Sequence, residues 1–235
     1  MAPRGPAYDG PLTARSRPLP SAHRLGCTSC YSKVANSFDP TKGMALRVRC
    51  RFGNPNSSAC VACGDQNDRC EPVPGLIRFD QLRVEALLEW GVHFFSVDSD
   101  ENDEIIPDEE GLPIHFAPEA VRCRVAGAQL RLLNAFNHMV TYHRTQHHLT
   151  SKVSLRFEAV TAYEKKIQDR RAVRQAAYRP LKLSAPAEEK AAYRRKTMLR
   201  LEPHDQGFDA WSAAVQEYVD SLREFADQIE DPENY

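Results

Sequence analysis

The feature that most constrains the fold of this chain is a cluster of cysteines in its first third. Six of its seven cysteines form two Cys-x2-Cys pairs, each followed by one further cysteine: Cys27, Cys30 and Cys50, then Cys60, Cys63 and Cys70. A Cys-x2-Cys turn lets two sulfurs reach one ion, and thiolates select zinc over magnesium or calcium. The spacing therefore predicts zinc, one or two ions per chain, held by these six cysteines.

The alternatives are a disulfide framework or buried free thiols. Disulfides need an oxidising compartment, and residues 1–24 lack the apolar stretch of a secretory signal. Six thiolates complete two tetrahedral zinc sites only if two sulfurs bridge, because eight coordination positions must be filled. The cysteine region has few apolar side chains, so we expect its folding to depend on the metal.

The second half of the cluster, CVACGDQNDRC at residues 60–70, resembles the fungal binuclear zinc cluster of transcription factors. Pro55 precedes the fourth cysteine, where that family usually carries a proline. The resemblance implies that Cys27 and Cys60 bridge two zinc ions and that DNA is a partner. The first half departs from the pattern, because residues 31–49 form a much longer gap than the family has. An uncharacterised fungal cysteine-rich domain family, with similarly spaced first-half cysteines, is the second likeness.

Basic residues lie around the third cysteine and are the candidate nucleic-acid contacts. Beside a metal module, such side chains can bind phosphates or place an arginine on a guanine edge. The alternative is a solvated surface whose positive charge balances an anionic metal–thiolate cluster. The candidates are Lys33, Lys42, Arg47, Arg49 and Arg51.

The net charge of −1 conceals blocks of opposite sign. Residues 98–117 and 201–235 are acidic, whereas residues 118–200 are basic. Such blocks either neutralise one another inside the chain or offer a basic surface to an anionic partner. Internal neutralisation is the simpler expectation, because charge patterning alone specifies no partner.

The hydrophobic periodicity predicts a mainly α protein: a zinc-stabilised cysteine module with little regular structure, then long helices in a bundle. From Pro118 to Arg179 the chain has no interior proline, and Val125, Leu132 and Met139 follow a heptad spacing. This predicts one long helix, or two broken near Thr150, in a coiled coil or helical hairpin. A homodimer through residues 118–179 and fold-back within the chain both satisfy the pattern.

The expected organisation has six parts. They are a disordered basic tail (1–24), a six-cysteine zinc module (25–75), a helix with a short extended segment (76–97), an acidic linker (98–117), long basic helices (118–202) and an acidic amphipathic C-terminal helix (203–235). No apolar run approaches the roughly 20 residues of a membrane span, so we expect no membrane contact.

Two further patterns suggest metals. The acidic residues from Asp98 to Glu109 match calcium-loop ligand positions, but Asp103 replaces the glycine that the turn requires, so we expect a solvated linker. Four histidines, at 138, 143, 147 and 148, gather on one helical stretch. We expect them to form a solvent-exposed face, the alternative being a pH-sensitive or metal-binding interface.

Enzyme signatures are absent from the sequence, which has no phosphate-binding glycine loop, no G-x-S-x-G elbow and no H-E-x-x-H pair. We therefore expect a non-enzyme. The leading interpretation is a nuclear, zinc-dependent DNA-binding transcriptional regulator of the fungal type, whose acidic C-terminal helix recruits a protein partner. The alternative is a zinc-stapled protein-interaction module, nuclear or cytoplasmic, that binds no nucleic acid.

Overall fold

The computed structural model describes residues 26–50, 59–66, 68, 70–97, 115–149, 153–178 and 184–230. Within these segments the chain is helical apart from turns and two isolated antiparallel bridges, which confirms the mainly α prediction. The helices are α1 (Thr28–Ser37), α2 (Val61–Asp65), α3 (Arg78–Gly91), α4 (Glu119–Gln146), α5 (Val153–Ala176), α6 (Ala187–Thr197) and α7 (Phe208–Glu230). Short 3-10 turns are η2 (Pro40–Lys42), η3 (Gly75–Ile77) and η4 (Val92–Phe95).

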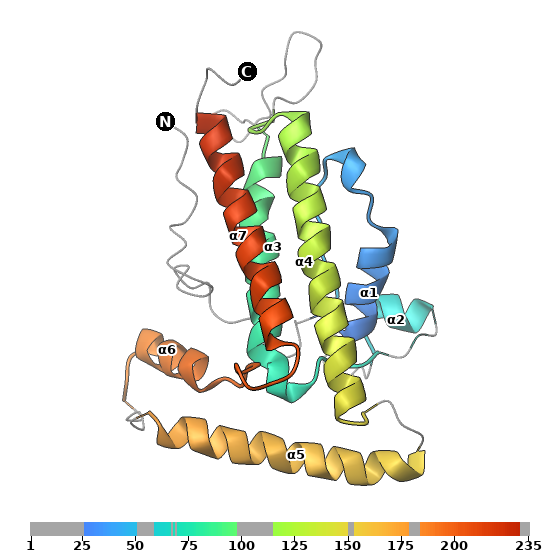
Figure 1. Ribbon diagram of the computed structural model, residues 1–235, viewed down its shortest axis with the longest axis vertical. Coiled ribbons are helices and arrows are strands. Elements are labelled where there is room, and N and C mark those ends of the chain that lie inside the picture. Colours follow the sequence, from blue (N-terminus) through green and yellow to red (C-terminus); the bar gives the residue numbers. More distant parts are fainter. Residues whose placement is uncertain are drawn as a thin grey trace.

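Helix α4 is the centre of the molecule. Figure 1 shows α3 and α7 running beside it, α1 on its other side, and α5 crossing beneath the bundle. The heptad positions Val125, Leu132 and Met139 are buried inside this chain's own core. Fold-back within the chain therefore covers the apolar stripe of α4, and a homodimer through residues 118–179 stays a prediction. The largest fully buried core side chains include Leu87, Leu132, Leu133, Phe136, Trp211 and Leu222.

Helix α7 packs its apolar face on α4 and brings acidic side chains to basic ones. Arg124 pairs with Glu224 at 3.1 Å, and Arg131 pairs with Glu217 at 3.3 Å. The guanidinium of Arg124 also lies 4.5 Å from the ring centre of Phe225. Exposed ion pairs of this kind add little stability, but they show that the basic and acidic blocks partly neutralise each other within the chain.

Two buried polar side chains fasten the core together. The Asp80 carboxylate accepts hydrogen bonds from Trp211 Nε1 at 2.9 Å and from the Leu201 N–H at 2.8 Å, joining α3 to α7. Gln129 of α4 accepts the Leu46 N–H at 2.9 Å and donates to the Leu88 carbonyl at 3.1 Å. Gln129 thereby ties the segment before Cys50 to the helical bundle.

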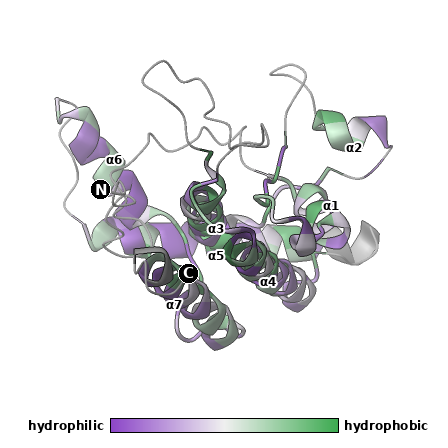
Figure 2. Cartoon of the chain, turned by 90° about the horizontal axis from the view of Figure 1, so that it is seen from above, coloured by the Kyte–Doolittle hydropathy of each residue, from purple (hydrophilic) through white to green (hydrophobic). Residues whose placement is uncertain are grey.

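Helix α5 is attached to the bundle along one narrow face. Tyr163 and Ile167 pack with Leu76 and Leu199, and most other side chains described on α5 are exposed. Ion pairs of Arg170 with Asp205 and of Arg174 with Glu202 complete the attachment. Seen from above, α6 and α2 lie at opposite edges of the molecule, and α6 is mostly hydrophilic (Figure 2).

Most predicted helices are present at nearly the expected positions. The helical region after residue 118 is broken, as one alternative had it, because α4 ends at Gln146 and α5 begins at Val153. Residues 92–95 form η4 rather than the predicted extended segment, although Val97 bridges to His115. The calcium-like loop and the tail 1–24 lie outside the described residues. None of the helices in the described segments combines the length and apolar character that crossing a bilayer requires.

Candidate metal centre and basic groove

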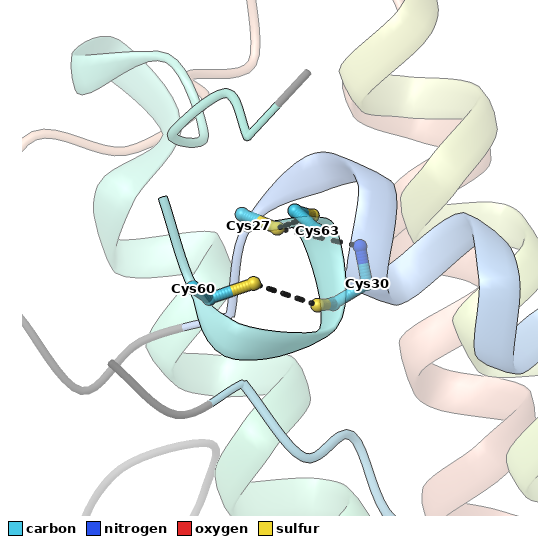
Figure 3. A group of neighbouring side chains, drawn as sticks. All are labelled: Cys27, Cys30, Cys60 and Cys63. Carbon is cyan, nitrogen blue, oxygen red and sulfur yellow. Dashed lines mark hydrogen bonds between the residues drawn. The ribbon is translucent and has the colours of Figure 1, made fainter. Parts of the chain in front are cut away.

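Cys27 and Cys60 are the residues immediately before α1 and α2, so Cys30 and Cys63 fall in the first turns of these helices. Residues three apart on a helix share one face, so each pair presents both sulfurs together. The two helix starts meet, with the sulfurs of Cys27 and Cys63 3.5 Å apart and those of Cys30 and Cys60 3.6 Å apart (Figure 3). The two Cys-x2-Cys pairs therefore converge on one point.

The spacing of these four sulfurs suits a tetrahedral metal ion. Metal–sulfur bonds of about 2.3 Å at the tetrahedral angle place the sulfurs about 3.8 Å apart. All four lie within 4.8 Å of one another, and the four residues are buried. The cysteines are free, and separations of 3.5 Å exceed the roughly 2.05 Å of a disulfide bond. Cys27, Cys30, Cys60 and Cys63 are positioned to bind a metal ion.

The remaining two predicted ligands lie beside this group. Cys50 and Cys70 are half-buried and pack against the four buried cysteines. The Cys70 sulfur accepts the Cys60 N–H at 3.3 Å, and Cys50 hydrogen-bonds to the Cys27 thiol. All six predicted ligands therefore gather in one place, although only four belong to the tight group.

The thiol cluster concentrates negative charge. Burial acts to raise the pKa of Cys60, but hydrogen bonds from the Cys63 N–H and from neighbouring thiols lower it to about 6. Burial raises the pKa of Cys63 to about 12, and a hydrogen bond to Cys50 together with burial raises the pKa of Cys27. One thiolate thus sits among buried thiols that donate to it. A bound cation would let the other thiols ionise and would neutralise their charge.

The start of α1 is locked to α3 by a buried polar network. Glu85 accepts the Gly26 N–H at 3.0 Å and the Tyr31 hydroxyl, while Gln81 donates to the Gly26 carbonyl at 2.6 Å. A Cβ at Gly26 would lie 2.7 Å from the Tyr31 ring, so only glycine fits directly before Cys27. Tyr31 is fully buried, and its ring meets Phe136 edge-on at 5.1 Å.

The second half of the module is fastened in the same way. The Glu71 carbonyl accepts the N–H and hydroxyl of Thr28 at 2.9 and 3.2 Å, and its carboxylate pairs with Arg144 at the end of α4. Lys33 pairs with Asp68 and donates to the Ala62 carbonyl at 3.4 Å. The Glu71–Arg144 pair joins the module to α4. Tyr31, Leu46 and Val73 of the module belong to the main hydrophobic core, beside which the cysteines form a cluster of their own.

Three of the five candidate nucleic-acid residues lie together. Lys42, Arg47 and Arg49 line one groove of about 690 Å³ with Arg122 of α4, and we call this the basic groove. Lys33 lies elsewhere, in the ion pair with Asp68, and Arg51 is outside the described residues. No sequence signal pointed to Arg122, because it reaches the groove only through the packing of α4.

The charge of the basic groove is not neutralised by the rest of the described chain. The exposed Arg47 and Arg49 form no ion pair with any described residue, in contrast to the basic side chains of α4 and α5 that pair with acids. The nearby Asp39 carboxylate is held by the N–H and hydroxyl of Thr41, at 3.0 and 2.6 Å. Counted over the described residues, the lining of the groove therefore has a net positive charge.

The prediction that the four histidines form a solvent-exposed face is wrong for His143, which is buried. Its Nε2 lies 2.9 Å from the Tyr163 hydroxyl, which itself accepts the Leu76 N–H at 3.2 Å. The hydroxyl therefore donates its proton to a neutral His143. Burial, reinforced by the positive charge of His147, lowers the pKa of His143 to about 3. Tyr163 lies within the helical region predicted for residues 118–179, but only the docking of α5 brings it to His143.

We expect this histidine to make the fold sensitive to mild acid. Unfolded His143 takes up a proton near its usual pKa of about 6.5, whereas folded His143 does so only near 3. Its contribution to stability is present above about pH 6.5 and falls at up to about 1.4 kcal/mol per pH unit below it. Urea denaturation between about pH 6.5 and 5 should therefore show that the free energy of unfolding falls less steeply with decreasing pH for His143→Gln than for the wild type. His138 is exposed, so His138→Gln should show the same pH dependence as the wild type. Equal slopes for the wild type and both variants would show that His143 does not cause the acid sensitivity.

A second group with ligand atoms, Glu202, His204 and Asp205, is close enough to hold a metal. Arg170 and Arg174 already pair with its two carboxylates. Through these two ion pairs the group anchors α5 to the bundle.

No protein-family model, curated protein or solved structure matches the chain. The likeness to the fungal binuclear zinc cluster thus rests on residues 60–70 and on the gathering of the six cysteines. The fold and the site together define a mainly helical protein with a buried cysteine cluster that is positioned to bind a metal ion.

Proposed function

We propose that this chain is a zinc-dependent DNA-binding regulator of the fungal type, acting in the nucleus as a binding protein rather than an enzyme. The observation that supports it is the basic groove near the cysteine cluster, where Arg47 and Arg49 form no ion pair with any described residue. Arg49 directly precedes Cys50, and Gln129 holds Leu46 at the other end of the same segment. Metal loading at Cys50 would fix the position of the groove arginines.

The proposed metal is zinc, in two ions bridged by Cys27 and Cys60. A set of thiolates favours zinc, and a structural zinc site stabilises the fold that its ligands form. Two ions need two shared sulfurs, and these two cysteines contact thiols of both halves. Cys27 interacts with Cys30, Cys50 and Cys63, and Cys60 with the same three. Cys70 interacts with both Cys27 and Cys60, which supports a bridging role for these two residues.

The test is a salt series of gel shifts on a labelled DNA hairpin that carries a duplex stem and a single-stranded tail. Phosphate contacts make the logarithm of affinity fall with the logarithm of salt concentration, by about 0.7 to 0.9 per contact. Arg47→Ala with Arg49→Ala should weaken binding and reduce that slope by about 1.4 to 1.8. Arg171→Ala with Lys165→Ala, on the exposed side of α5, is the matched control. Absence of binding at low salt, or loss equal in both double variants, would refute the proposal.

A zinc-stapled interaction module is the second candidate, and the exposure of α5 favours it. Val173 on this helix is 70% exposed, and it is one of the most exposed apolar side chains among the described residues. Light scattering should then report a homodimer that Val173→Asp converts to a monomer. A hairpin DNA that fails to bind, together with such a dimer, would select this candidate over the regulator.

A further inference from the structure

The lining of the basic groove is not only basic. Apolar side chains from α1, from the segment after η2 and from η4 line the same groove, and we call them its apolar floor: Val34, Phe38, Met44, Ala45 and Phe95. Met44 is 63% exposed and is one of four exposed large apolar side chains among the described residues. The groove therefore offers an apolar surface that the described chain leaves open.

A polar atom is also left without a partner at this wall. The Nδ1 atom of His115 is buried and has no hydrogen bond within the described residues, and His115 lines the groove. Buried polar atoms are normally satisfied, so an unsatisfied one at a groove wall marks a place for a ligand atom. The groove combines cations, an apolar floor and a free hydrogen-bonding nitrogen.

Its volume is that of a pocket that can enclose a small ligand. A volume of about 690 Å³ falls within the roughly 300–1,000 Å³ of pockets that enclose a ligand. A duplex presents phosphates outside and only base edges in its grooves, so it would satisfy the arginines and leave Met44 uncovered. An unstacked base exposes an apolar face that fits such a floor, while its phosphate reaches the cations.

The first Cys-x2-Cys helix is poorly placed to read a duplex. Helix α1 is packed on α4 through the buried Tyr31, and Asn137 donates to the Tyr31 carbonyl at 3.3 Å. The outward residues Ser32 and Ser37 carry no charge, and Lys33 is held in its ion pair. Insertion of α1 into a major groove would require it to leave the core.

We propose that the basic groove binds one or two unstacked nucleotides of a single-stranded nucleic acid, with the bases on the apolar floor and the phosphates on Arg47, Arg49 and Arg122. This inference rests on the proposed function, since it names the form of the nucleic acid that the same groove takes. Sequence preference is expected to be weak, because stacking accepts the face of any base.

The test compares a labelled single strand of about 15 nucleotides with its duplex by fluorescence anisotropy at low salt, using the zinc-loaded full chain. The single strand should bind about tenfold more tightly than the duplex. Met44→Ala should weaken the single strand about three- to tenfold and leave the duplex unchanged. Tyr142→Ala, which removes another exposed apolar side chain on α4 that does not line the groove, is the matched control and should change neither.

The outcomes separate this inference from the proposed function. Duplex binding as tight as single-strand binding, lost in the Arg47→Ala, Arg49→Ala protein but not in Met44→Ala, overturns the inference and leaves the DNA-binding proposal standing. Failure of both nucleic acids to bind overturns both. A polyglutamate peptide that displaces the single strand at equal charge concentration would assign the groove to an acidic protein segment and overturn the inference. Circular dichroism of each variant confirms that the helices are retained.

Discussion

Cys63→Ser is expected to lower the melting temperature by about 10 °C and to abolish stoichiometric metal binding. Cys63 is fully buried at the contact between the two Cys-x2-Cys pairs, and its sulfur lies 3.5 Å from that of Cys27. Structural zinc supplies much of the folding free energy of small cysteine modules, so losing one ligand should cost about 4 kcal/mol or more. For a chain of this size, each kcal/mol shifts the melting temperature by about 2 to 4 °C.

The seventh cysteine provides the matched control. Cys123 is half-buried on α4 and donates only to the Thr41 carbonyl, at 3.3 Å, a bond that a serine hydroxyl can also form. Cys123→Ser should therefore change stability by less than about 1 kcal/mol and keep the full metal content. Differential scanning calorimetry with metal analysis of both variants measures the contrast. Equal effects of the two substitutions would show that the cluster is no metal site.

Phe136→Ala is expected to cost about 3 to 5 kcal/mol and to destabilise the cysteine module together with the helical bundle. Phe136 is fully buried on α4. Its ring centre lies 5.1 Å from that of Tyr31 and 5.7 Å from that of Trp211. A cavity there removes contacts of α1 and α7 at once, because one core serves both parts. Heating should then release metal and melt the helices in a single transition at a lower temperature than in the wild type.

Helix loss by circular dichroism and metal release by a colorimetric chelator measure the two events in one sample. Tyr142→Ala, at a 40% exposed position of the same helix, should change the midpoint little. If metal release keeps the wild-type temperature while the helices of Phe136→Ala melt earlier, the module folds separately from the bundle and the shared core is refuted.

The sequence predicted the parts of this protein whose signals are local. The Cys-x2-Cys spacing predicted that the two sulfurs within each pair lie together. This arrangement is local, because each pair sits at the start of one helix. The apolar spacing of Trp211, Val215 and Tyr218 predicted α7 for the same reason. The charge blocks anticipated its ion pairs with α4, although not which residues would pair.

The rest depends on packing between distant segments. The long gap between Cys30 and Cys50 continues α1, forms η2 and docks on α4, where Arg122 donates to the Gly43 carbonyl at 3.5 Å. Gly43 ends η2 in the left-handed conformation that glycine adopts without strain. Neither the groove formed by this docking nor the burial of His143 under α5 has a local pattern. From the sequence alone, a histidine cluster on a helix is expected to be solvent-exposed, because the helix that packs over it cannot be identified.

Metal analysis of the purified chain by native mass spectrometry tests the central claim most directly, since everything proposed for the groove depends on a metal-held cysteine cluster. We expect two zinc ions per chain, retained through gel filtration and lost in Cys60→Ser. A single bound ion would keep the four-sulfur centre and remove the proposed bridging. A folded chain that carries no metal, with the cluster thiols reacting freely with a thiol reagent, would contradict the account.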